Sequence, residues 1–156
     1  MYEVYISEDL ERDARECPVA HKIMTTPIPA VVNEAMRDRP SAEVAAAVRS
    51  LLARLGIKAR VWRSAPRDRI TIVRILLEMP SATENLAAHR LHLPGDYEAC
   101  WRCSLLKAAE ERLEVLVVAA FPDLCNRSDY DREIYDHPVR IEWTTGPPEW
   151  RSVTIP

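Results

Sequence analysis

Two histidines and two cysteines lie close together in the second half of the chain. His89 and His92 have two residues between them, and Cys100 and Cys103 repeat that spacing. Histidines three positions apart share one face of a helix, and a Cys-x-x-Cys pair can present both sulfurs to one ion. The set predicts one structural zinc ion, because four protein ligands leave no open position. Alternatively, the cysteines are small core residues and the histidines are partly exposed.

Cys17 and His21 lie four residues apart on a predicted helix. At this spacing a histidine could activate a cysteine nucleophile. No residue nearby would orient the histidine or stabilise an oxyanion. Since Cys17 precedes a proline that suits the first helical position, we interpret it as the residue that begins the helix.

Acidic residues gather between the prolines at 122 and 138. The group contains Asp129, Asp131, Glu133, Asp136 and His137. In an extended chain the first three share one face, so a divalent metal site for phosphodiester hydrolysis is conceivable. The spacing does not fit a calcium-binding EF-hand, because Ile134 and Arg140 occupy its glycine and glutamate positions. We predict a solvated polar loop without a catalytic role.

Basic residues are concentrated between positions 49 and 74, where eight of them accompany one acid, Asp68. The candidate partner-binding residues are Lys58, Arg60, Trp62, Arg63, Arg67 and Arg69. Strand alternation places Lys58, Arg60 and Trp62 on one face. Arginine beside an exposed tryptophan is typical of surfaces that bind phosphates and stack bases, or of protein-binding hot spots. Alternatively, the arginines pair with acids elsewhere and Trp62 lies in the core.

Hydrophobic periodicity and breaker residues predict an α+β fold. Strands are expected at 2–6, 57–63, 69–78, 115–121, 139–144 and 151–155. Helices are expected to start at Pro18 and Pro29, and to cover 41–55, 81–92 and 97–113. Two hairpins are predicted, 57–78 and 139–155. Together these give a mostly antiparallel sheet of about five strands, with helices packed on one face.

The size and composition of the chain indicate one domain over residues 1–156. Its 47% hydrophobic and 29% charged residues exclude a disordered protein. No apolar run is long enough to span a membrane, and the opening segment is acidic where a signal peptide is basic. Four cysteines are too few for a disulfide scaffold. A cytoplasmic protein is therefore expected.

Residues 4–10 read VYISEDL, and residues 17–20 read CPVA. This pattern resembles the opening of short proteins encoded by phages and prophages of GC-rich bacteria. The chain departs from it at residues 13–15, where a glycine turn and a second cysteine are common. The resemblance implies a phage or prophage source, the cytoplasm of a host cell as location, and host factors as partners. It implies no activity.

The sequence as a whole predicts a small non-enzymatic binding module. Its basic hairpin, residues 57–78, would engage an anionic partner, either a host protein or a nucleic acid. Two alternatives remain open at this point. One is a metal-dependent phosphodiesterase that uses the acids of residues 129–137, and the other is a zinc-stabilised structural protein.

Overall fold

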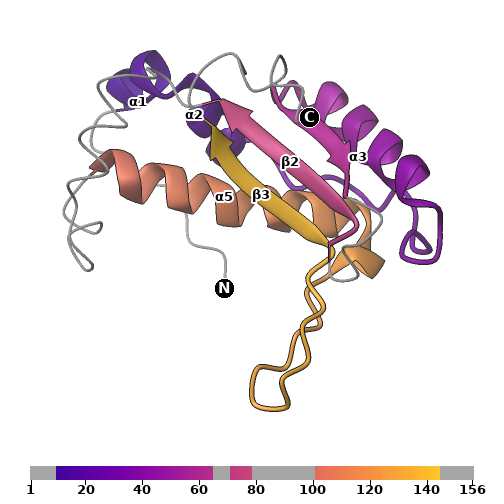
Figure 1. Cartoon of the computed structure of the whole chain (residues 1–156). Helices are drawn as coiled ribbons and strands as arrows, with labels where there is room; N and C mark the ends of the chain where they lie inside the picture. The colour runs from indigo at the N-terminus through magenta and orange to yellow at the C-terminus, as the bar shows by residue number, and fades with distance from the viewer. Residues whose placement is uncertain (1–9, 65–70, 79–100, 145–156) are drawn as a thin grey trace, which may run out of the picture.

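The computed structural model describes residues 10–64, 71–78 and 101–144 of the chain. Four helices, one short 3-10 turn and three strands lie in these ranges (Figure 1). In chain order they are α1 (Leu10–Glu16), α2 (Pro18–Thr25), α3 (Ser41–Leu55), β1 (Arg60–Arg63), β2 (Val73–Glu78), α5 (Trp101–Ala120), η2 (Pro122–Leu124) and β3 (Val139–Thr144). The fold is therefore α+β, as the sequence predicts.

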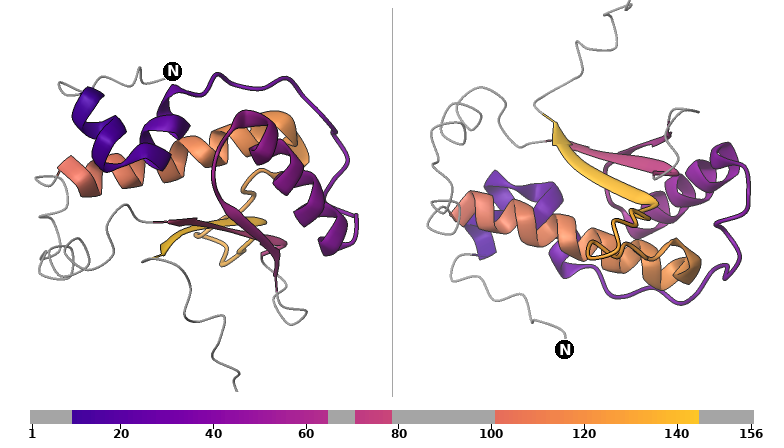
Figure 2. Two further views of the ribbon diagram at one scale, coloured as in Figure 1. Left: turned by 90° about the horizontal axis from the view of Figure 1, so that it is seen from above. Right: turned by 60° about the horizontal axis from the view of Figure 1, so that its bottom comes forward.

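The three strands form one mixed sheet in the order β1-β2-β3. β1 and β2 are antiparallel, with Val61 opposite Ile75. β2 and β3 are parallel, with Ile75 opposite Ile141, because α5 separates them in the chain and returns it to the same end of the sheet. In the left view of Figure 2 the sheet is seen nearly edge-on, and the helices lie on one of its faces.

The core lies between that face of the sheet and the helices. Every second residue of the central strand points into it, and Val73, Ile75 and Leu77 have no exposed surface. From the helices, the main contributors are Val44, Val48, Leu51, Leu52, Leu113, Leu116 and Val117. These residues recur at three- and four-residue spacing, so each helix turns one apolar stripe toward the sheet.

The predicted helix 41–55 is confirmed at both ends. Gly56 follows it with a φ of 73°, a left-handed conformation that glycine adopts without steric cost. The amide of Ile57 then donates to the carbonyl of Leu52 at 3.0 Å, which satisfies one of the last helical acceptors. The hairpin is also confirmed, with strands shorter than the predicted 57–63 and 69–78.

The predicted strand at 115–121 is wrong, because α5 continues to Ala120. Leu113, Leu116 and Val117 are fully buried while Val115 is 41% exposed, a pattern of helical rather than strand period. Burial of this stripe outweighs the strand preference of the valines.

The predicted helix beginning at Pro29 is also wrong, since residues 26–40 contain no helix. This segment has another structural role. The amides of Val32 and Asn33 both donate to the carbonyl of Ala120, so the segment caps the C-terminal end of α5.

The prediction of about five strands, mostly antiparallel, is not confirmed. The sheet in the described ranges has three strands, one of its two pairings is parallel, and it contains one hairpin. The predicted strands 2–6 and 151–155 and the predicted helix 81–92 lie outside the described residues. The second predicted hairpin therefore stays a prediction.

Candidate functional site

The basic residues of the hairpin lie on and around β1, an edge strand. Arg60 and Trp62 are half-buried, and Lys58 and Arg63 are exposed. Trp62 pairs with Arg74 of β2, and Arg74 pairs with Arg140 of β3. Paired residues share one face of a sheet, so this row crosses the face opposite the helices. We call this the outer face. Lys58 precedes β1 and lies at the margin of this face, whereas Arg63 pairs with Val73 and so belongs to the other face, at the end of β1.

Acids neutralise only part of this charge. Glu142 accepts a hydrogen bond from Arg74 Nη2 at 2.8 Å and forms an ion pair with Arg140, whose Nε lies 2.6 Å from the carboxylate. Among the described residues, Lys58, Arg60 and Arg63 form no ion pair. The Nη1 atom of Arg60 is buried from water, and no described residue accepts a hydrogen bond from it. The described acids therefore leave the charges of Lys58 and Arg60 without an ion-pair partner.

The structure adds two residues that the site prediction did not include, Arg74 and Arg140. Both follow the alternation of their strands, with apolar neighbours turned to the core. That alternation is the sequence signal that could have identified their shared face. No sequence signal indicates that Arg74 and Arg140 are neighbours, because this depends on the parallel pairing of β2 and β3. Arg67 and Arg69, also predicted for this surface, lie outside the described residues.

The predicted zinc ligands His89, His92 and Cys100 lie outside the described residues, and so does the side chain of Cys103. Among the side chains that the structure does describe, no group of three or more histidines, cysteines or acids is arranged to hold a metal ion. Zinc binding therefore stays a prediction.

Cys17 is the N-cap residue of α2, as predicted. Its carbonyl accepts the amide of His21 at 2.9 Å, which is the first hydrogen bond of the helix, and Pro18 occupies the first helical position. The side chain of Cys17 is only 2% exposed. This placement agrees with the interpretation of Cys17 as a structural residue.

Residues 125–137, which we call the arm, connect η2 to β3 and extend away from the body of the molecule (Figure 1). The amide and carbonyl of Asp129 exchange two 2.8 Å hydrogen bonds with those of Ile134, which closes the arm into a narrow turn. Glu133 within the turn has a left-handed φ of 56°. The arm matches the predicted polar loop, although its tip also carries exposed apolar side chains.

The acids of the arm are dispersed rather than gathered. Asp129 pairs with Arg132 at 3.5 Å, at the tip of the arm. Asp136, at its root, pairs with Arg37. His137 contacts Glu114 of α5 at 2.8 Å. The candidate ligands for a hydrolytic metal thus face different partners.

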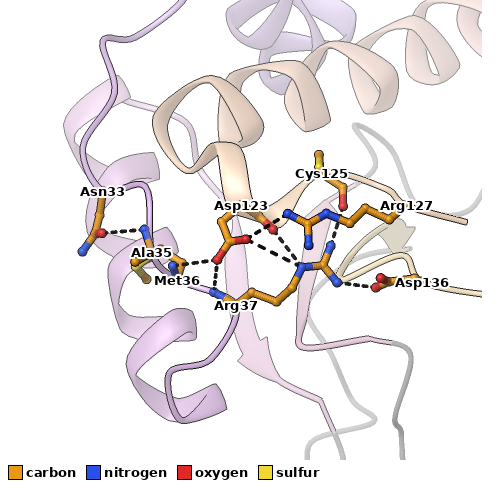
Figure 3. Close-up of polar contacts among 8 residues, drawn as sticks. All are labelled: Asn33, Ala35, Met36, Arg37, Asp123, Cys125, Arg127 and Asp136. Carbon is orange, nitrogen blue, oxygen red and sulfur yellow. Dashed lines mark hydrogen bonds and ion pairs between the residues drawn. The ribbon is translucent and has the colours of Figure 1, made fainter.

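Arg37 fixes the root of the arm (Figure 3). Its Nε donates to the carbonyl of Asp123 at 2.9 Å, and its Nη2 donates to the carbonyl of Cys125 at 2.7 Å. Its Nη1 pairs with the carboxylate of Asp136. One side chain, 18% exposed, thus joins both ends of the arm to the segment that follows α2.

Asp123 completes this network from the other direction. Its Oδ2 accepts the backbone amides of Met36 and Arg37, and its Oδ1 pairs with Arg127 at 3.1 Å. The hydrogen bond from the Arg37 amide is the main reason that the pKa of Asp123 lies below its ordinary value of 3.8, and the charge of Arg127 adds to it. Asp123 is therefore ionised at neutral pH.

A second cluster of acids lines a pocket of about 340 Å³ at the edge of the sheet, where the edge strand β3 meets α5 and where Arg140 and Glu142 of the outer face also face the acids of that helix. It contains Glu110, Glu111, Glu114, Glu142, His137 and Arg140. Burial raises the pKa of Glu110 above its ordinary value of 4.5, and the charges of Glu111, Glu114 and Glu142 raise it further, against a smaller effect of Lys107. The folded protein therefore binds the Glu110 proton more tightly than the unfolded chain does.

Glu110→Gln is expected to make the protein more stable than the wild type at neutral pH and not at acidic pH. A raised carboxyl pKa contributes stability below 4.5, and this contribution is lost as the pH rises through the folded value. Melting temperatures of both proteins from acidic to neutral pH measure the difference. Glu43→Gln, at an exposed position, is the control. A difference that shrinks as the pH rises would contradict the expectation.

Comparisons of this chain with protein-family models, with curated proteins and with solved structures found no match. Within the ranges that the structure describes, no helix combines the length and the apolar character needed to cross a lipid bilayer.

Proposed function

We propose that this protein is a non-enzymatic binding module that engages a nucleic acid through its outer face. The observation that carries the proposal is a set of cations at and beside β1, Lys58, Arg60 and Arg63, which form no ion pair with any described acid. An isolated surface ion pair stabilises a fold by only about 0–1 kcal/mol, so fold stability gives little reason to concentrate such residues. Binding of an anionic partner is a stronger reason for basic residues to be concentrated on one surface.

The position of the arginines supports a phosphate-bearing partner. Arg74 and Arg140 extend the cationic surface from the edge strand across the sheet, and they share a single acid, Glu142. A phosphate group offers acceptors to guanidinium and ammonium donors. Trp62 lies in the same row and is half-buried.

The experiment compares the wild type with the variant Lys58→Glu/Arg60→Glu, which we call the face variant. Affinity for a fluorescent single-stranded oligonucleotide of about 20 nucleotides is measured by anisotropy across a range of salt concentrations. The face variant is expected to bind more than about tenfold more weakly at about 50 mM salt. The slope of log affinity against log salt should fall by about 0.7 for each phosphate that the variant no longer binds.

The matched control is Arg15→Glu/Arg54→Glu, which makes the same change in net charge on exposed helical residues. It should retain most of the affinity. An equal loss of affinity in the control and in the face variant would show that only net charge matters. That result would contradict a defined binding site. Absence of oligonucleotide binding by the wild type would also overturn the proposal, and an acidic protein surface would then become the partner to test.

The alternative of a metal-dependent phosphodiesterase gains no support from the described acids. Asp129 and Asp136 each pair with an arginine, and Asp129 lies at the tip of the arm whereas Asp136 lies at its root. The proposal therefore assigns residues 129–137 no catalytic role.

A further inference from the structure

The tip of the arm presents a preformed apolar surface to solvent. Tyr130 is 67% exposed, Tyr135 55% and Ile134 48%. The two tyrosine rings lie 5.9 Å apart at an angle of 59°, a favourable tilted arrangement. The hydrogen bonds between Asp129 and Ile134 hold the turn that carries them, and Arg37 holds the root. Fold stability does not require these rings, since they contribute nothing to the core.

The charge around these rings indicates the kind of surface that would cover them. Residues 129–135 contain three acids, Asp129, Asp131 and Glu133, and one base, Arg132. Two such tips would repel each other, which disfavours pairing of arm with arm. The complementary surface would be cationic. The chain carries one itself, at Lys58 and Arg60.

We propose that the arm of one copy docks on the outer face of a second copy, and that the second arm docks reciprocally on the first. Tyr130 and Tyr135 would supply the apolar centre of each contact, and Asp131 and Glu133 would lie against Lys58 and Arg60. Because each copy uses its arm and its outer face on the other, the assembly is a closed twofold dimer. No free arm remains to which further copies could add. The inference stands apart from the proposed function, although both use the same face. Dimerisation and nucleic-acid binding should therefore compete.

The test is sedimentation velocity of the full chain over protein concentrations up to about 1 mM, at low and high salt. The wild type is expected to form dimers that dissociate as salt increases. The arm variant Asp131→Lys/Glu133→Lys and the face variant should each raise the dimer dissociation constant by more than about tenfold. The matched control Glu34→Lys/Asp38→Lys changes the charge of exposed residues outside the arm and should leave the constant unchanged.

Mixing the two variants gives the decisive measurement. The arm variant has a basic arm and an unchanged basic face, and the face variant has an unchanged acidic arm and two acids at positions 58 and 60 of its face. Both contacts of a mixed dimer are complementary, so the mixture should form a heterodimer although each variant alone is monomeric. A mixture that stays monomeric would overturn the proposal, provided that circular dichroism shows both variants folded.

Further outcomes separate this proposal from the proposed function. Tyr130→Ser/Tyr135→Ser should weaken the dimer more than about tenfold with an unchanged melting temperature, because both rings are exposed. A dimer that strengthens with salt would indicate apolar pairing of arms and contradict the inference. A wild type that is monomeric at all concentrations, yet binds oligonucleotide through Lys58 and Arg60, would refute the dimer and leave the proposed function intact.

Discussion

Replacement of Arg37 with alanine is expected to lower the free energy of unfolding by about 2–4 kcal/mol. The guanidinium donates to two backbone carbonyls and pairs with Asp136, and the side chain is 18% exposed. Its removal leaves the carbonyls of Asp123 and Cys125 without this donor, and it leaves the carboxylate of Asp136 without its cation. The cost therefore exceeds that of an exposed ion pair.

Urea denaturation measures this decrease, and limited trypsin digestion locates it. Trypsin can cut after Arg127 and Arg132, which both lie in the arm. Faster cleavage there in Arg37→Ala would show that the root has loosened. Arg39→Ala is the matched control, because Arg39 lies two residues away, is exposed, and makes one local hydrogen bond to the carbonyl of Ala35. Similar decreases of stability in the two variants would show that the Arg37 network does not hold the arm.

Contacts of this kind mark the limit of what the sequence predicts. Arg37 meets Asp123, Cys125 and Asp136 at separations of 86 to 99 residues. No spacing rule reaches across such distances, and the prolines at 122 and 138 indicated only that the segment between them is a loop. The anchoring of the arm follows from tertiary structure alone, and the docking proposed for the arm depends on it.

The parts of the fold that the sequence predicts correctly are those with local causes. The helix 41–55 has a periodic apolar stripe and a glycine that terminates it. The hairpin has two β-rich runs joined by a short polar connection. Alternation along β1 likewise predicted that Arg60 and Trp62 share a face. To predict that Arg74 and Arg140 lie in one row with Trp62, one would need to know the order and direction of the three strands, which the sequence does not indicate.

The region around Val117 shows how tertiary packing overrides a local preference. Residues 115–118 read Val-Leu-Val-Val, which favours a strand by propensity. In the structure this run continues α5, which contacts α2, α3, η2 and β3. Helical geometry turns Leu116, Val117 and Ala120 into the core together, whereas a strand would turn alternate residues outward. The additional apolar area that the longer helix buries therefore favours the helical over the extended conformation of this run.

Replacement of Val117 with proline is therefore expected to cost at least about 3 kcal/mol, enough to unfold a domain of marginal stability. Proline would remove an amide donor in the last turn of α5 and place its ring against the carbonyl of residue 113, one helical turn earlier. Val115→Ala is the matched control at the exposed position. Alanine favours a helix over valine, so this variant should be slightly more stable than the wild type. Melting curves followed by circular dichroism measure both changes. A loss of stability in Val115→Ala would instead indicate that residues 115–121 form the strand that their composition favours.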